Sequence, residues 1–110
     1  MTFQGYGKAM QTEDVRFIAG TSLTGTYQDL GSPLENISKA LILKNLTDVT
    51  VELSIDDGET TGFRLPPSTA DVVSEESLFI AKGSQIQVRH TGVPSLTGEV
   101  IVETIYVTRR

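Results

Sequence analysis

Short runs of alternating apolar and polar residues dominate this sequence and limit the folds open to it. The clearest run extends from Val49 to Ile55, where valine, leucine and isoleucine alternate with Thr50, Glu52 and Ser54. Because successive side chains of a strand point to opposite faces, this run predicts a strand with one buried and one solvated face. Glycine, proline, asparagine or aspartate interrupts such runs about every ten residues. This spacing is typical of an all-β sandwich or barrel.

Further strands are expected on both sides of this run. Residues Ile37–Leu46 include three consecutive apolar side chains, which favours a deeply buried strand. Residues Glu99–Thr108 are β-branched and apolar on both faces, so we expect them at the centre of a sheet or at a subunit contact. Residues Ala70–Val73 are few enough for an edge strand. The other expected strands are Val15–Ala19, Leu23–Leu30, Thr61–Leu65 and Ser84–His90, and residues Ser74–Ile80 are expected to be one helical turn or irregular.

These segments together predict an all-β fold, a single antiparallel β-sandwich with jelly-roll or immunoglobulin-like topology and seven or eight short strands. A chain of 110 residues has room for one domain with one core. The first dozen residues carry no periodicity. We therefore expect residues 1–20 to form an extended N-terminal arm and residues 21–110 to form the sandwich domain.

Charge and composition argue against several functional classes. Nine basic and fourteen acidic residues give a net charge of −5, and the basic residues are scattered except for Arg109 and Arg110. Such a surface repels phosphate backbones, so we expect no direct contact with nucleic acid. The absence of cysteine excludes disulfides and thiolate chemistry. The N-terminal residues include no apolar run, so neither a secretory signal nor a membrane anchor is expected.

The acidic segment Asp56-Asp57-Gly58-Glu59 is the first candidate for chemistry, as a metal or carboxylate site. Calcium loops place their oxygen ligands at staggered positions, whereas two adjacent aspartates in an extended chain point to opposite faces. Asp-Gly is also a strong hairpin signal, because glycine accepts a positive φ and aspartate caps its own backbone. We therefore expect a turn that leads into Thr61–Leu65, with no metal and no cofactor.

Catalytic motifs give little support for an enzyme. His90 is the only histidine, and the nucleophile motif G-x-S-x-G is absent. The segment GTSLTG at residues 20–25 lacks the lysine of a phosphate-binding loop. We expect no catalytic residues. A hydrolase built on a β scaffold, with His90 as its base, remains the alternative.

Two aromatic residues lie in the glycine-bearing segment FQGYGK of the expected arm. Phe3 and Tyr6 are candidate partner contacts there, because exposed aromatic side chains on a terminal segment often anchor a protein to its partner. The alternative is a frayed tail without a role.

The order of segments between residues 23 and 108 resembles small β-sandwich virion structural proteins of tailed bacteriophages. The resemblance is carried by the NLTDVTV turn and strand that ends in the Asp-Gly hairpin, by the segment Phe63–Pro67, and by FIAKG at residues 79–83 with the Tyr106-bearing last strand. It covers about four-fifths of the chain. It implies a non-enzymatic structural subunit that assembles through its arm and sheet edges as a tail or head–tail accessory protein. A capsid decoration (cement) protein on the head surface is the alternative.

The resemblance also implies partners and a location. The subunit would be made in the host cytoplasm and located in the virion, in contact with other virion proteins and with copies of itself in a symmetric homo-oligomer. Secondary contacts would come from Val93, Pro94, Arg109 and Arg110. A second alternative is a carbohydrate- or receptor-binding β-sandwich. With no tryptophan and three tyrosines, the chain is poorly equipped for stacking on sugars.

Overall fold

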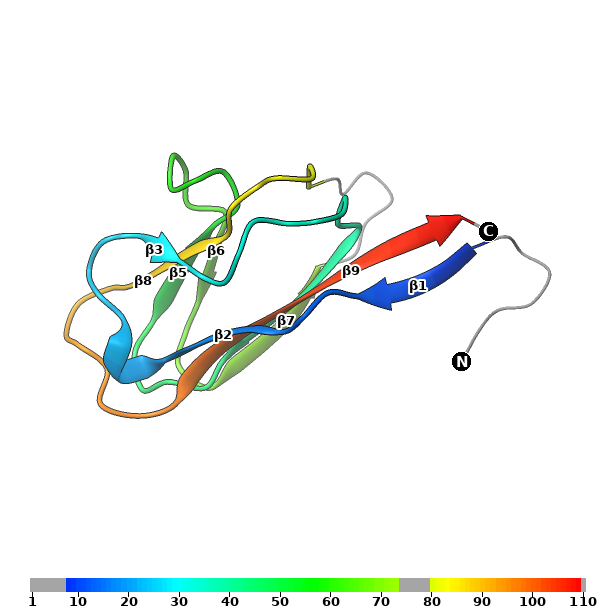
Figure 1. The fold of residues 1–110 in the computed structure, drawn as a ribbon. Coiled ribbons are helices and arrows are strands. Elements are labelled where there is room, and N and C mark those ends of the chain that lie inside the picture. Colours follow the sequence, from blue (N-terminus) through cyan, green and yellow to red (C-terminus); the bar gives the residue numbers. More distant parts are fainter. Residues whose placement is uncertain (1–7, 74–79, 110) are drawn as a thin grey trace.

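Two antiparallel sheets form the fold (Figure 1), which the computed structural model describes for residues 8–73 and 80–109. One 3₁₀ helix, η1 (Gly20–Ser22), follows the second strand. The strands are β1 (Lys8–Thr12), β2 (Arg16–Ala19), β3 (Gln28–Asp29), β4 (Ala40–Asn45), β5 (Val51–Ser54), β6 (Phe63–Leu65), β7 (Thr69–Val73), β8 (Gln87–His90) and β9 (Glu99–Arg109).

The pairing of the strands is nested. The larger sheet has the order β1-β9-β4-β7, with β2 beside β1 on the same edge of β9, and the smaller sheet has the order β3-β8-β5-β6. Thus β5 pairs with β6, β4 with β7, β3 with β8 and β2 with β9, as in one long hairpin rolled into two layers. This is a jelly roll. The β-sandwich prediction is confirmed, and the immunoglobulin-like topology is not observed, since that fold pairs several consecutive strands within a sheet.

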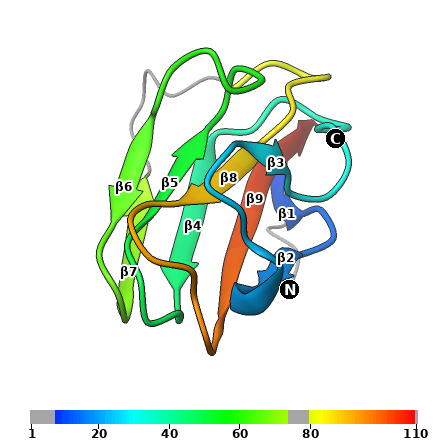
Figure 2. The same cartoon turned by 90° about the vertical axis from the view of Figure 1, so that its left-hand side faces the viewer.

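The core fills the space between the two sheets, which Figure 2 shows as two layers. The larger sheet contributes leucines of β4 and valines of β9, and the smaller sheet contributes residues of β5 and β8. Truncating a side chain of this kind costs about 2–5 kcal/mol, so these residues determine the fold's stability. The core side chains that are almost fully buried include Leu41, Leu43, Val51, Leu53, Ile86, Val88, Val100 and Val102.

Most of the expected strands are present; β2, β4, β5, β6 and β8 are shorter than expected, and β7 and β9 are each one residue longer. The central position of Glu99–Thr108 is confirmed, because β9 lies between β4 on one edge and β1 and β2 on the other. The edge position of Ala70–Val73 is also confirmed, since β7 is the last strand of the larger sheet. Residues 74–79, expected to be a helical turn or irregular, lie outside the described part of the chain.

The expected strand Leu23–Leu30 is wrong over most of its length, where only Gln28 and Asp29 form β3. Local side-chain hydrogen bonds explain the difference. The backbone N–H of Thr24 donates to Oε1 of Gln28 at 2.8 Å, and Nε2 of Gln28 donates to the carbonyl of Ser22 at 3.1 Å. These bonds satisfy backbone groups that a strand would use in its ladder, so the chain bends before β3 begins.

The expected arm contains two strands from Lys8 onward, which raises the described strand number to nine. β1 pairs with the end of β9, and β2 pairs with its beginning. Figure 1 shows β1 and the C-terminal half of β9 extending away from the sandwich as a two-stranded ribbon. Periodicity missed β1 because alternation reports burial, whereas this strand is held by its pairing with β9. A domain boundary at residue 20 stays a prediction.

Candidate assembly surface

Two loops are joined at the end of the sandwich opposite the ribbon (Figure 1), the β4–β5 loop and the β8–β9 loop. The hydroxyl of Ser95 donates to Oδ1 of Asp48 at 2.7 Å, and the backbone N–H of Leu96 donates to the same oxygen at 3.1 Å. The hydrogen bond from Ser95 is the main reason that the pKa of Asp48 lies below its usual value. Gly98 (φ 83°) has no room for a side chain, because a Cβ there would lie 2.0 Å from the carbonyl oxygen of Leu46. These contacts join the two loops to each other.

This fixed end of the sandwich presents apolar side chains to the outside. Val93 is 72% exposed and Leu96 is 80% exposed, and Leu46 on the neighbouring loop is also exposed. We call these three residues the apolar loop tip. Val93 and Pro94, both candidate contacts from the sequence, are exposed here. A contact made by them stays a prediction.

The other candidate contacts lie at or beyond the limits of the description. Phe3, Tyr6 and Arg110 are outside the described residues. Arg109 is the last residue of β9, and its backbone is paired with Lys8 of β1. Contacts of these four residues with a partner stay predictions.

The outer faces of the two sheets differ in chemistry. The smaller sheet carries an ion pair in which Arg89 lies 2.8 Å from Glu52, and the guanidinium of Arg89 also lies 4.3 Å from the ring centre of Tyr27. The larger sheet carries an ion pair too, Lys44 with Glu103 at 3.9 Å, but it also exposes apolar side chains, and Phe17 and Val72 are 66% and 64% exposed there. Single exposed apolar side chains are normal on a protein surface, whereas a contiguous apolar patch is typical of a contact surface.

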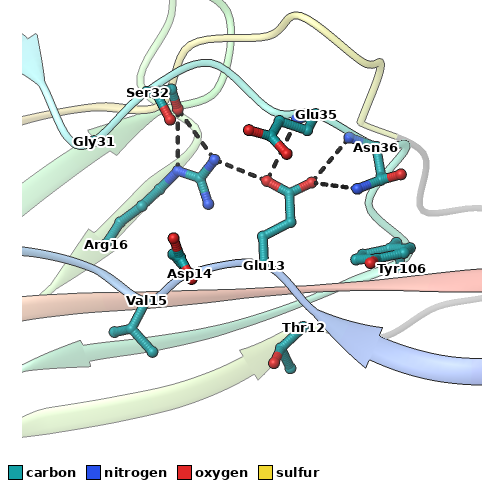
Figure 3. A pocket seen from close by; sticks show the side chains of 10 residues that line it. All are labelled: Thr12, Glu13, Asp14, Val15, Arg16, Gly31, Ser32, Glu35, Asn36 and Tyr106. Atoms are coloured by element: carbon teal, nitrogen blue, oxygen red, sulfur yellow. Dashed lines mark hydrogen bonds and ion pairs between the residues drawn. The ribbon is translucent and has the colours of Figure 1, made fainter.

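A pocket of about 300 Å³ lies where β1 and β2 meet the loop before β4 (Figure 3). An ion pair lies in this pocket, in which Nη2 of Arg16 is 3.0 Å from Oε1 of Glu13. Arg16 also donates to the carbonyl of Ser32 and, through Nη1, to the hydroxyl of Thr104 at 3.2 Å. The pocket is lined by Thr12, Glu13, Asp14, Val15, Arg16, Gly31, Ser32, Glu35, Asn36 and Tyr106.

The carboxylate of Glu13 is fully engaged by the protein itself. Besides Arg16, it accepts the backbone N–H groups of Glu35 and Asn36 and the side-chain amide of Asn36 (Figure 3). Burial alone would raise the pKa of Glu13, but these hydrogen bonds outweigh it and leave the pKa below its usual value. The pair connects the segment between β1 and β2 to the sandwich. The polar atoms of Glu13 and Arg16 already have partners within the protein, so we interpret the pocket as a structural junction between this segment and the sandwich.

The acidic segment forms a turn, and the turn prediction is confirmed in its main feature. Gly58 has φ 83° and Asp57 has φ 61°, and the chain reverses from β5 into β6. The connection is longer than a tight hairpin because Asp56 closes a wider loop. Its carboxylate accepts hydrogen bonds from the hydroxyls of Ser54 and Thr60, which lower its pKa to about 2. Within residues 8–73 and 80–109, no group of three His, Asp or Glu side chains could hold a metal ion.

His90 lies at the end of β8 with its ring partly buried. Its Nδ1 atom has no hydrogen-bond partner in the described structure. A catalytic histidine is normally oriented by a carboxylate on this nitrogen.

Among the described residues there is no helix long and apolar enough to cross a membrane.

Several residues of this surface were not predicted from the sequence. Glu13 and Arg16 are distant from their partners Asn36 and Thr104 in the chain, so no local pattern reveals them. The sequence contains only a weak indication that Phe17 is exposed. In β2 the charged Arg16 is buried and the apolar Phe17 and Ala19 are exposed, which is the reverse of the usual pattern.

Comparison with known proteins gives a likeness of fold. No protein-family model matches the chain, and a search of curated proteins finds no match. A chain in the solved capsid asymmetric unit of cyanophage Pam1 has a similar structure, with a TM-score of 0.56 and 12% sequence identity. The likeness covers 99% of this chain and 90% of that chain. At this identity it establishes a shared fold.

Proposed function

We propose that the chain is a non-enzymatic structural subunit of a tailed-phage particle, bound to the head as a capsid decoration protein. The observation that carries the proposal is the likeness to a chain of a cyanophage capsid unit over 99% of the present chain. The jelly roll is a fold that viral capsid proteins use repeatedly. The resemblance of residues 23–108 to phage virion proteins supports the same assignment.

The β1–β9 ribbon supports assembly through sheet edges. β4 pairs with β9 as far as Ile105, while β9 continues to Arg109 with β1 as its described partner. A two-stranded ribbon is only marginally stable in water, and open edges accept strands from neighbouring chains. A ribbon of this kind gains stability when a neighbouring subunit adds a strand to it.

The apolar loop tip supports a second contact at the opposite end. Its loops are joined by the hydrogen bonds to Asp48 and packed closely at Gly98, which lowers the ordering cost of presenting Val93 and Leu96 to a partner. Contacts at both ends of an elongated subunit suit a protein that is repeated over a particle surface.

A tail or head–tail accessory protein, the role expected first from the sequence, would use the same surfaces. Symmetry distinguishes the two locations, since a decorated head holds on the order of hundreds of copies and a neck or tail ring about a dozen. Copy number per purified particle, measured by quantitative mass spectrometry, is therefore the test. We expect hundreds of copies. A dozen copies would indicate the tail or neck, and absence from particles would contradict both roles.

A carbohydrate-binding module is favoured by one observation, the jelly roll itself, which lectins also use. The described tyrosines argue against it. The guanidinium of Arg89 lies over one face of the Tyr27 ring, and the hydroxyl of Tyr106 already donates to Oε1 of Gln11 at 2.7 Å, so both side chains have partners within the protein. Stacking on a sugar requires an open aromatic face. A glycan array with reproducible hits would favour the lectin function.

A further inference from the structure

An apolar stripe runs diagonally across the outer face of the larger sheet. Phe17 of β2 lies directly opposite Ile101 of β9, and Ile42 of β4 lies directly opposite Val72 of β7. The second pair lies one row further along the strands, because Ile101 is level with Lys44 and not with Ile42. The apolar stripe thus crosses four neighbouring strands and consists of Phe17, Ile101, Ile42 and Val72.

One basic and one acidic residue border the centre of this apolar stripe. Lys44 lies in the row of Ile101, and Glu103 lies in the row of Ile42, so their backbone positions are on opposite sides of the stripe and their side chains reach toward each other across it. Their closest atoms are 3.9 Å apart, and their side chains are 42% and 28% exposed. An exposed ion pair at this distance contributes little to stability, so its members are available for other partners.

This arrangement is complementary to itself. A two-fold axis that lies along the apolar stripe places each apolar side chain against the same region of a second copy. The same axis carries Lys44 of one copy to the position that faces Glu103 of the other, and the reverse contact forms by symmetry. Two-fold interfaces require such self-complementarity, because the same surface must serve both partners.

The smaller sheet lacks this property. Its outer face has Glu52 between Arg64 and Arg89, in the order of the strands β6, β5 and β8. Glu52 already binds Arg89 at 2.8 Å. A face of interspersed charges without an apolar stripe is typical of solvated surface. The difference points to the larger sheet as the covered one.

We propose that the outer face of the larger sheet binds the same face of a second copy of this chain, with Lys44 of each copy paired to Glu103 of the other. Ile101 and Ile42 form the centre of the contact, and Phe17 and Val72 form its ends. Two sheets that pack face to face in this way bury their apolar side chains in a layer about 10 Å thick. The inference deepens the proposed function by naming one partner, and it rests on that function only for its place in a particle.

The size of the face sets the expected affinity. Four strands spaced about 4.8 Å apart, with six residues of about 3.4 Å each, give a face of roughly 400 Å². Stable complexes bury about 800 Å² on each partner, so this dimer is weak on its own and is measured at protein concentrations on the order of 10⁻⁴ M. In a particle, other contacts would raise the effective concentration of the two faces.

Complementary charge reversal tests the pairing. Lys44→Glu alone puts two acidic residues on each face, and Glu103→Lys alone puts two basic residues there. Each variant alone is expected to dimerise at least about tenfold more weakly than the wild type in sedimentation equilibrium, because like charges then face each other. An equimolar mixture of the two variants is expected to regain association, now as a heterodimer.

Recovery on mixing cannot arise from the pairing of Lys44 with Glu103 inside one chain, since neither variant chain contains that pair. Lys82→Glu is the matched control. It makes the same change of charge in an exposed turn and is expected to leave association unchanged. Phe17→Asp is expected to weaken association without unfolding the chain, because Phe17 is 66% exposed.

Three outcomes overturn the proposal. The first is a wild-type protein that stays monomeric at a concentration on the order of 10⁻⁴ M. The second is single variants that associate as strongly as the wild type does. The third is an equimolar mixture of the two variants that does not regain association. With the first outcome, the partner of this face would have to be a different virion protein. All measurements use purified protein in solution, so their failure leaves the particle copy number, and with it the proposed function, to be judged separately.

Discussion

Glu13 and Arg16 form an ion pair at 3.0 Å in which both side chains are almost completely buried. Glu13 follows β1 and Arg16 begins β2, so the pair fixes the point where the ribbon joins the sandwich. Its carboxylate also receives the backbone N–H groups of Glu35 and Asn36. One carboxyl group therefore links the first strands to the loop that precedes β4.

Removing this carboxylate should destabilise the fold strongly. Glu13→Ala leaves the guanidinium of Arg16 buried without its counter-ion, and breaking a buried pair from one side costs about 3–5 kcal/mol. We expect a loss of this size in the free energy of unfolding, measured by urea denaturation. Glu35→Ala is the control, because only the backbone N–H of Glu35 binds Glu13. An equal effect of both substitutions would contradict the assigned role of the pair.

Acidic pH should weaken the fold through three carboxyl groups. The folded pKa of Glu13 lies below its ordinary value of 4.5, and the folded pKa of Asp56 is about 2 against an ordinary value of 3.8. Asp48 shifts in the same direction. Because a lowered folded pKa favours the ionised native state, this stability is fully present above the ordinary values and is lost as the pH falls through the folded ones. The melting temperature should therefore decline from just below pH 4.5 toward pH 2.

A matched variant isolates the contribution of Glu13. Glu13→Gln removes one titrating group, so its melting temperature should be lower than that of the wild type near neutral pH and should fall less steeply in acid. Parallel curves for the two proteins would show that Glu13 does not carry this pH dependence.

The acidic turn should depend on its glycine and tolerate changes at its second aspartate. Gly58→Val forces a β-branched residue into φ 83° and brings its Cβ to within 2.6 Å of Oε1 of Gln87, so we expect a loss of about 2 kcal/mol or more in thermal unfolding. Asp57→Asn should stay within about 0.5 kcal/mol, since asparagine also adopts this conformation. Calcium should leave the melting temperature of both wild type and Asp57→Asn unchanged. A calcium-dependent shift that Asp57→Asn abolishes would make the segment a metal site.

Asn45 should be among the least replaceable polar residues. It is completely buried, its Nδ2 group donates to the carbonyls of Val49, Leu65 and Pro66, and its Oδ1 atom accepts two hydrogen bonds from Thr47. Asn45→Ala leaves several of these buried groups unsatisfied at about 1–3 kcal/mol each. We expect a loss of at least about 3 kcal/mol, whereas Asn36→Ala, at a half-buried position, should cost less. Urea denaturation of both variants makes the comparison.

The sequence predicted the parts of the fold that burial controls. Val49–Ile55 and Glu99–Thr108 alternate or run apolar because they contact the core, and both contain strands where expected. β1 was not predicted, because it is held by its pairing with β9 outside the core and therefore leaves no alternation of apolar and polar residues in the sequence. Leu23–Leu30 was mispredicted because Gln28 satisfies backbone groups locally.

The candidate surface was predictable only in part, for a similar reason. Val93 and Pro94 are exposed, as a loop between two strands suggests. The apolar stripe depends on the register of four strands, so Phe17 and Val72 become neighbours of one surface only after the sheet has formed. Glu13 and Asn36, which are 23 residues apart in the chain, likewise become hydrogen-bond partners only in the folded structure. Single-residue patterns do not encode such registers.

The nested pairing also constrains the order of folding. β5 and β6 are close in the chain, whereas β9, the last strand, pairs with β1, β2 and β4, which all lie in the first half of the sequence. Contacts between distant residues form late because closing their loops costs entropy. The sheet should therefore zip from the acidic turn outward, and Ile101 and Glu103 should reach their places on the outer face in the final step. Self-association would then be confined to chains that have finished folding, which protects a crowded assembly pathway from incomplete subunits.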